Sequence, residues 1–246
     1  SLIELESGDV LFVGDTHGDF RSTVSVVERA RVGGYERLVF LGDYVDRGPQ
    51  QIENMNYVLA LKIHDPDFVV LLRGNHETPE ANAYYGFYAT VCTTLSRRLY
   101  GLYSRLFSQL PFAALLSDGV LALHGGIAKG LSSVRQLSRL PKGQVSVRDP
   151  MAFQVLWNDP RDHVRGFQPS WRGPGIYYFG SDAFERFAER NRIRMLVRAH
   201  EVFREGYRLY FGGKVLSVFS AAYYGFPIDA KVAAHERDGR VRVIPI

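Results

Sequence analysis

Three short apolar runs in the first third of the chain each end near a glycine that is followed by an aspartate or an asparagine. The runs are Val10–Val13 before Asp15, Leu38–Leu41 before Asp43, and Phe68–Leu72 before Asn75. The polar residues are 28 and 32 residues apart, close to the ~30 residues of one strand-helix-strand unit. Successive units of this kind pair parallel strands through right-handed crossovers. We therefore expect the three polar turns to open onto one crevice at one edge of a sheet.

Glycines flank the polar residues of these turns, namely Gly14, Gly18, Gly42, Gly48 and Gly74. Glycine permits tight or left-handed backbone conformations. These can bring carboxylate and imidazole atoms within ~2.0 to 2.2 Å of a cation. A lone buried carboxylate is costly, and a bound metal ion removes that cost. The turns therefore predict a metal site.

Two later motifs add histidines: His124 precedes a pair of glycines, and His200 follows Arg198 and Ala199. The complete set of candidate metal ligands is Asp15, His17, Asp43, Asn75, His124 and His200. This mixture of oxygen and imidazole donors suits Mn²⁺, Fe or Zn²⁺, and the absence of thiolates argues against a structural zinc site.

The rest of the chain predicts mixed sheets flanked by helices, an α/β layered domain that covers residues 1–246 as a single unit. Ala81–Gln109 has a helical pattern, and we expect its aromatic and leucine side chains in the core. Phe112–Leu116 and Val120–Leu123 predict a strand pair closed by Ser117–Gly119. The remaining predicted elements are a helix at Asp182–Asn191 and strands at Met195–Arg198, Tyr207–Phe211, Val215–Phe219, Ala230–Glu236 and Val241–Ile244.

Composition excludes several classes of function. No apolar run approaches the ~20 residues that span a bilayer, and residues 1–9 lack the features of a signal peptide, so we expect a cytoplasmic protein that contacts no membrane. The single cysteine, Cys92, is expected to be a small core residue. The formal charge is +4, but the arginines are scattered, so no nucleic-acid partner is expected. Because little of the chain lies outside the motifs, we expect a monomeric, stand-alone catalytic domain. The sequence does not predict whether regulatory subunits bind it.

The ordered motifs resemble the phosphoprotein phosphatase family of metal-dependent serine/threonine phosphatases, in the calcineurin-like metallophosphoesterase superfamily. The similarity covers roughly Leu5 to Ile244. It extends to Leu72–Glu77, Tyr85–Tyr88, Leu110–Ala114, Leu156–Pro160, Arg172-Gly173 with Phe179-Gly180, and Phe219–Ala221. The resemblance implies a four-layer αββα sandwich, in which two mixed β-sheets are flanked by helices.

The resemblance also implies two divalent metal ions, with Mn²⁺ as the first choice and Fe or Zn²⁺ as alternatives. In the family pattern, Asp15 and His17 bind the first ion, and Asp43 bridges both. Asn75, His124 and His200 bind the second ion. A hydroxide shared by the two ions then attacks phosphorus directly, and no covalent phosphoenzyme is needed.

Four further residues match catalytic positions of the family. His76 is the general acid that protonates the leaving oxygen, and Asp46 orients its ring. Arg47 and Arg172 bind the phosphate. Asn75 and Tyr224 are the other two substrate-binding residues. Arg73 is expected to support the site from behind rather than to touch phosphate. His64, His163 and His235 are expected to be ordinary surface or core histidines.

The chain departs from its family in one loop. Relatives usually carry Ser-Ala-Pro-Asn-Tyr-x-Gly, whereas Ser220–Gly225 lacks the proline and the asparagine and is one residue shorter. Counting from the strand selects Tyr224, and counting back from the glycine selects Tyr223. Because strand register is fixed by the pleat, we expect Tyr224 to face the metals.

The resulting functional hypothesis is a phosphatase that acts on phosphoserine and phosphothreonine in phosphorylated proteins. The alternative is a nucleotide or dinucleoside polyphosphate phosphohydrolase of the same superfamily. Asp46, Arg73 and Glu77 favour the protein-phosphatase pattern. A noncatalytic binding module is disfavoured, because no expected ligand is missing. Activity toward phosphotyrosine is left open by the sequence.

Overall fold

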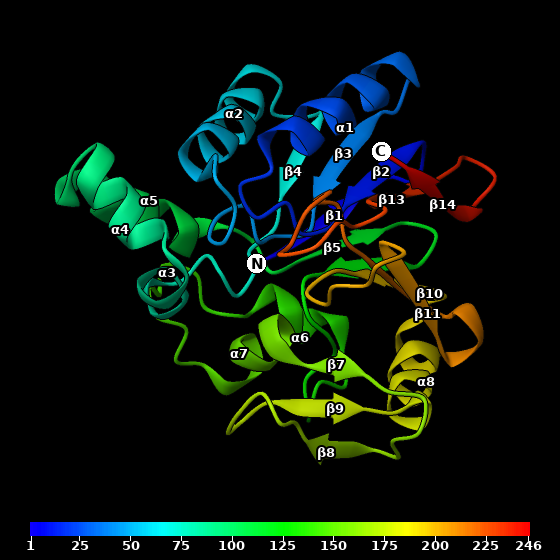
Figure 1. Cartoon of the computed structure of the whole chain (residues 1–246). Coiled ribbons are helices and arrows are strands. Elements are labelled where there is room, and N and C mark those ends of the chain that lie inside the picture. The colour runs from blue at the N-terminus through cyan, green and yellow to red at the C-terminus, as the bar shows by residue number, and fades with distance from the viewer.

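The structure is a computed structural model that describes all 246 residues. Two β-sheets pack face to face, and helices cover both outer faces (Figure 1). This four-layer α/β arrangement confirms the fold class expected from the sequence. None of the helices combines the length and the apolar character needed to cross a bilayer.

The two sheets contain every strand that the sequence predicted, and each end lies within one residue of the expected position. The six-stranded sheet has the order β1-β5-β6-β10-β12-β11. Its strands are β1 (Leu2–Leu5), β5 (Ala113–Leu116), β6 (Val120–Leu123), β10 (Met195–Arg198), β11 (Tyr207–Tyr210) and β12 (Val215–Val218). The five-stranded sheet has the order β14-β13-β2-β3-β4. Its strands are β2 (Val10–Val13), β3 (Arg37–Phe40), β4 (Val69–Leu71), β13 (Lys231–His235) and β14 (Val241–Pro245).

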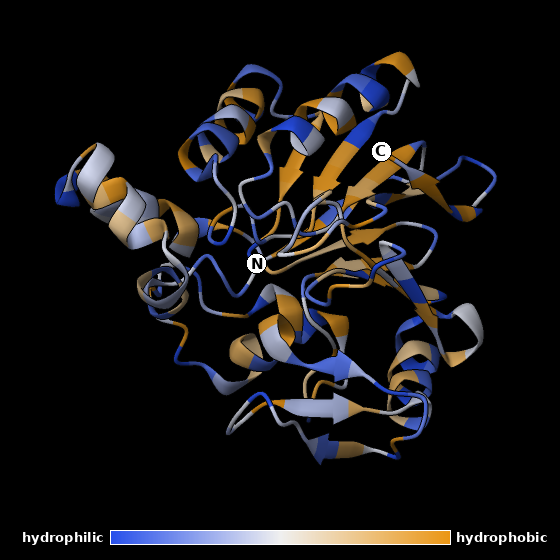
Figure 2. Ribbon diagram, viewed as in Figure 1, coloured by the Kyte–Doolittle hydropathy of each residue, from blue (hydrophilic) through white to orange (hydrophobic).

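Three apolar layers hold the sheets and helices together. The layer between the sheets contains fully buried strand residues such as Phe12, Val39 and Val197. One outer layer packs α1 (Phe20–Val32), α2 (Gln51–His64), α4 (Phe87–Thr94) and α5 (Arg97–Gln109) on the five-stranded sheet. The other packs α6 (Val134–Ser138), α7 (Pro150–Trp157) and α8 (Ser181–Asn191) on the six-stranded sheet. Figure 2 shows the corresponding concentration of apolar residues in the central strands.

Strands β2, β3 and β4 are parallel neighbours, as their spacing predicted. Val13 pairs with Phe40, and Phe40 pairs with Leu71. Helices α1 and α2 form the crossovers between them. The carboxyl ends of the three strands therefore lie at one edge of the sheet, where the polar turns begin.

The helical pattern over Ala81–Gln109 is confirmed, but the segment forms three helices, α3 (Pro79–Tyr85), α4 and α5. Gly86 ends α3 with a φ of 116°. Ser96 starts a new helix by accepting a hydrogen bond from the N–H of Leu99. The expectation that the aromatic and leucine side chains of this segment lie in the core holds for only some of them. Phe87 and Phe107 are buried, whereas Tyr84, Leu95, Leu99 and Leu102 are exposed. Periodicity alone does not reveal the two breaks or the direction in which each short helix faces.

Two features of the fold were missed. Strand β1 lies at the edge of the six-stranded sheet, parallel to β5. A small third sheet is formed by β7 (Asp159–Pro160), β8 (Phe167–Pro169) and β9 (Tyr177–Phe179). Its strands are two or three residues long and two of them contain proline, so no alternating pattern marks them. Cys92 is half-buried against the helical layer, as expected for a small packing residue.

A pair of glycine substitutions tests the close contact between the two sheets. A Cβ on Gly14 would lie 2.2 Å from the carbonyl oxygen of Val218, whereas a Cβ on Gly101 in α5 would have nothing nearer than 3.9 Å. We expect Gly14→Ala to destabilise the protein by ~1 to 3 kcal/mol through overpacking. Gly101→Ala should stabilise it by up to ~1 kcal/mol, because alanine is the better helix former. Urea unfolding monitored by circular dichroism measures both, and an unchanged midpoint for Gly14→Ala would contradict the close approach of the two sheets at this glycine.

Candidate metal centre

All six candidate ligands come together where strands of both sheets end. Asp15, Asp43 and Asn75 lie beyond the carboxyl ends of β2, β3 and β4, and His124 and His200 lie beyond β6 and β10. Each of the ligand side chains is buried. The two sheets are joined at this point, because the N–H of Ser220 after β12 donates to the carbonyl of Asp15 (3.1 Å).

The orientation of the His17 ring is set by a backbone carbonyl. Its Nδ1 lies 2.9 Å from the carbonyl oxygen of Val45 and must donate to it. Burial lowers the pKa of His17 to about 4, so the ring is neutral and Nε2 carries a lone pair. This Nε2 lies 3.7 Å from Oδ2 of Asp15 and 3.6 Å from Oδ2 of Asp43. Three electron-rich atoms therefore face one another without a donor between them.

A second group of lone pairs surrounds His124. Its Nδ1 donates to the carbonyl oxygen of Leu41 (3.0 Å). Its Nε2 lies 2.7 Å from Oδ1 of Asn75, 3.2 Å from Nδ1 of His200 and 3.4 Å from Oδ2 of Asp43. Burial lowers the pKa of His124, but the nearby carboxylates of Asp43, Asp15 and Glu77 together outweigh burial and the net shift is upward. The group attracts positive charge, which a divalent cation can supply.

The electrostatics of the carboxylates point in the same direction. Burial and the charge of Asp43 raise the pKa of Asp15 to about 7. Two carboxylates in one buried pocket repel each other unless a cation lies between them. Asp43 belongs to both groups of side chains that could hold an ion, one with His17 and His76 and one with His124 and His200. The residues therefore fit two divalent cations that share Asp43.

Left-handed backbone conformations in the site are carried mainly by residues other than glycine, which corrects the expectation from the sequence. The φ angles are positive at His17, Asp43, Asp46, Arg47 and His200, and among the five flanking glycines only at Gly18 and Gly42. The other three are required by close approach: a Cβ on Gly48 would lie 2.0 Å from the carbonyl oxygen of His17. Such strain is stored where surrounding contacts fix the backbone, typically at functional sites.

Glu77 supplies some of those fixing contacts, and the sequence analysis assigned it no such role. Its carboxylate accepts hydrogen bonds from the N–H groups of Asp43 (2.8 Å), Tyr44 (3.0 Å) and Gly74 (2.9 Å). It thereby ties the turn after β3 to the turn after β4. Its signals in the sequence were its position directly after the Asn75-His76 pair and its match to the protein-phosphatase pattern.

His76 is held by Asp46. Nδ1 of His76 lies 2.8 Å from Oδ2 of Asp46. Asp46 also accepts hydrogen bonds from Nδ2 of Asn82 (3.0 Å) and the N–H of Phe87 (2.8 Å). Burial lowers the pKa of His76, but the charges of Asp43 and Asp46 outweigh burial and the net shift is upward. The ring is thus fixed, with its Nε2 directed 3.9 Å from Oδ2 of Asp43.

Tyr85 belongs to the site, although the helical sequence pattern predicted that it packs in the core. Its ring centroid lies 4.8 Å from that of His76 and 3.8 Å from Cζ of Arg47. The ring therefore separates the two side chains and supports both. The segment Tyr85–Tyr88 belonged to the family resemblance, but helical periodicity gave no reason to turn this tyrosine toward the metals.

The two candidate phosphate-binding arginines reach the site from different elements. Arg172 follows β8 and donates from Nε to Oδ2 of Asp159 (2.6 Å), which also pairs with the buried Arg198 (2.8 Å). Together with Asp15, His200 and Tyr224, Arg172 lines a cleft of about 300 Å³. Arg47 follows β3. Arg73 is buried and donates to the carbonyls of Glu77, Gln144 and Val145, so it supports the site from behind, as expected.

Tyr224 lies beside the candidate ligands, and Tyr223 points to solvent. The Tyr224 ring centroid is 5.1 Å from that of His17, and Cζ of Arg47 is 5.4 Å from the Tyr224 ring. Tyr223 is 63% exposed. This is the arrangement obtained by counting from the strand.

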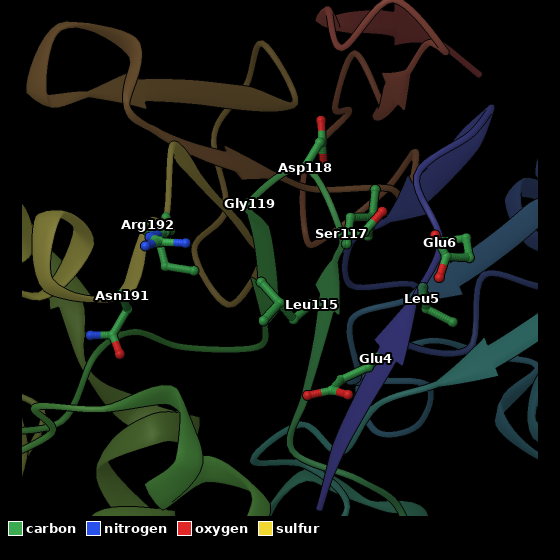
Figure 3. A pocket seen from close by; sticks show the side chains of 11 residues that line it. Glu4, Leu5, Glu6, Leu115, Ser117, Asp118, Gly119, Asn191 and Arg192 are labelled. Carbon is green, nitrogen blue, oxygen red and sulfur yellow. The ribbon is translucent and has the colours of Figure 1, made fainter.

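The three remaining histidines lie outside the site. His64 and His163 are exposed. His235 is buried and contacts the carbonyl of Gly8 and the carboxylate of Asp118. Another cleft, of about 520 Å³, lies between β1, the β5–β6 turn and the end of α8, and it contains none of the candidate ligands (Figure 3).

Comparison with known proteins agrees with this geometry. Residues 8–204 match the family model described as calcineurin-like phosphoesterase. The chain is 34% identical to the serine/threonine-protein phosphatase PP1-delta of Caenorhabditis elegans, over 97% of this chain and 78% of that protein. It is 36% identical to a probable serine/threonine-protein phosphatase of Encephalitozoon cuniculi, over 98% of this chain but only 54% of that protein.

Solved structures give the same result. A protein serine/threonine phosphatase from Saccharomyces cerevisiae with similarity to human phosphatase PP5 superposes with a TM-score of 0.87. It is 27% identical, and the alignment covers 100% of this chain and 84% of that chain. A cold-active protein-tyrosine phosphatase of Shewanella, 18% identical with a TM-score of 0.69 over 98% of this chain and 81% of that chain, shares the fold.

The matches to the family model and to the nematode enzyme each span most of this chain. The chain therefore belongs to the calcineurin-like phosphoesterases and, within them, to the serine/threonine protein phosphatases, a family of metal-binding hydrolases.

Proposed function

We propose that residues 1–246 form a single catalytic domain that hydrolyses phosphoserine and phosphothreonine esters of proteins. This proposal rests on two groups of side chains with lone pairs, one around His17 and one around His124, that share Asp43. Asp15 and His17 would hold one cation with Asp43; Asn75, His124 and His200 would hold the other. We take Mn²⁺ as the first choice of ion, with Fe and Zn²⁺ as alternatives, and a monomer acting in the cytoplasm.

Bound divalent cations in such a centre lower the pKa of water and offset the charge of a phosphate. The chain itself supplies the proton for the departing oxygen. Because Nδ1 of His76 donates to Asp46, Nε2 is the atom that faces the substrate. The negative charge of Asp46 at Nδ1 favours the protonated ring that a general acid requires.

Arg47 and Arg172 would bind the phosphate from two sides. Asp159 holds Nε of Arg172, which leaves the terminal nitrogens of the guanidinium to donate to phosphoryl oxygens. Tyr85 and Tyr224 flank the guanidinium of Arg47. The planar donors are thus oriented before substrate arrives, which reduces the entropy lost on binding.

Tyr224 belongs to a short hairpin that is attached to the amino-terminal end of α1. The N–H of Ala222 donates to Oδ2 of Asp19 (2.8 Å). The same carboxylate caps α1 by accepting hydrogen bonds from the N–H and the hydroxyl of Ser22 (3.1 and 2.7 Å). The family pattern has proline at the position of Ala222, and proline has no N–H to donate. This bond therefore replaces the rigidity of the missing proline and positions Tyr224.

Metal dependence tests the shared carboxylate. Chelation should abolish hydrolysis of a phosphoserine peptide, and Mn²⁺ should restore it. Asp43→Asn should lose most of both ions, whereas Asp15→Asn should lose about one, because only Asp43 serves both sites. Metal content is measured by mass spectrometry after desalting, with the exposed Asp238→Asn as the control. Full activity in a verified metal-free preparation would refute the proposal.

The general acid is tested by changing the leaving group. We expect His76→Asn to lower kcat for a phosphoserine peptide by ~10² to 10⁴ with its metal content unchanged. The loss should be much smaller for p-nitrophenyl phosphate, whose leaving group needs no proton. Equal losses on both substrates would show that His76 is not the acid. A dinucleoside tetraphosphate assayed beside them should be the poorer substrate; the reverse preference would favour the nucleotide hydrolase.

The attachment of the hairpin is tested by removing each end of one hydrogen bond. Ala222→Pro removes the donor, and Asp19→Ser shortens the acceptor while keeping a good helix cap. Both should weaken inhibition by phosphate several-fold and speed hydrogen exchange in residues 221–228, because Tyr224 is less constrained. The double variant should be no worse than either single one. Asp149→Ser, at the cap of α7, is the matched control, and additive losses would contradict the shared bond.

A further inference from the structure

A groove of about 330 Å³ runs between α2 and α5, outside the metal centre. Its lining is almost entirely apolar and consists of Asn56, Leu59, Leu95, Leu99, Leu102, Tyr103 and Leu106. Figure 1 shows α4 and α5 standing out from the side of the molecule next to α2. None of the candidate metal ligands or phosphate-binding residues contributes to the groove.

Helix α5 has two apolar faces, and only one of them packs in the core. Tyr100 and Phe107 on the inner face are buried against the helical layer. The second face carries Leu99, Leu102 and Leu106 at positions i, i+3 and i+7, which fall on one side of a helix, and Leu95 lies just before the helix begins at Arg97. Leu95, Leu99 and Leu102 are 44%, 38% and 46% exposed and belong to no core cluster. Single exposed leucines are ordinary, but a contiguous apolar stripe marks an interaction surface.

The α5 side of the groove carries positive charge that no ion pair neutralises. Arg98 and Arg105 are one heptad apart and flank the leucine stripe at helical spacing, and Arg97 is exposed nearby. None of the three forms an ion pair. Helices α4 and α5 contain no acidic residue, and the facing helix α2 contains one, the exposed Glu53, a turn before Asn56. The surface thus combines a leucine-lined groove with a basic edge.

We propose that this groove binds an acidic amphipathic helix of another protein. Leucine-type side chains at i, i+3 or i+4, and i+7 of the partner would fill the groove, and aspartates or glutamates beside them would pair with the arginines. The leucines from Leu99 to Leu106 span about 10 Å at the helical rise of 1.5 Å per residue, which matches about two turns of a partner helix. A second copy of this chain fits poorly, because its arginines would face those of the first copy.

The test is selection of helical peptides on the intact enzyme. A displayed library of 15-residue helix-forming peptides should yield binders with the apolar spacing above and an excess of aspartate and glutamate. A selected peptide, labelled with fluorescein, should bind about tenfold or more weakly to Leu99→Gln/Leu102→Gln and to Arg98→Glu/Arg105→Glu. Its affinity should also fall with added salt. Phosphatase activity without peptide should be unchanged in both variants, which separates this surface from the metal centre.

Matched controls lie elsewhere on the surface. Leu209→Gln changes a leucine of similar exposure on β11, and Arg190→Glu changes an exposed arginine on α8. Neither should alter peptide binding. The proposal is overturned if selection yields no binders, if the binders lack acidic residues, or if their affinity is the same for the groove variants and the controls. Dimerisation of the enzyme that Leu99→Gln/Leu102→Gln abolishes would overturn it as well, since the groove would then bind a second copy.

Discussion

One carboxylate oxygen, Oδ2 of Asp43, lies between the imidazoles of His17 and His124, which follow strands of different sheets. Both rings turn a lone pair toward it, because a backbone carbonyl accepts the proton on their other nitrogen. A buried negative charge in such surroundings is tolerable only when cations neutralise it. The strand ends of the two sheets thus form a pocket whose buried charge is stabilised by bound metal. Glu77 holds the strained turns of this pocket in place.

The parts of the structure that could be predicted from the sequence are those governed by local pattern. Strands β2 and β3 are apolar runs that end at a polar turn, and their parallel pairing follows from the length of chain between them. The residue types and their order along the chain indicated the six candidate ligands that the fold brings together. Counting from the strand selected Tyr224 over Tyr223, and the ring of Tyr224 lies 5.1 Å from that of His17.

Contacts between distant segments were not predictable. The direction of Tyr85 depends on the break at Gly86, which divides a pattern that is helical throughout. The anchoring of Arg172 depends on Asp159, which lies in a strand too short to recognise. The attachment of the hairpin depends on an N–H of Ala222 that meets a helix cap more than two hundred residues earlier. In each case a side chain with an ordinary local role also serves the site, and only the folded arrangement shows this.

The central claim is that two cations share Asp43, and anomalous diffraction from crystals soaked in Mn²⁺ tests it most directly. We expect two anomalous peaks about 3.5 to 4 Å apart, both within bonding distance of the Asp43 carboxylate. One should contact Nε2 of His17 and the other Nε2 of His124. A single peak, or two peaks of which one does not touch Asp43, would contradict the shared carboxylate on which this description of the site rests.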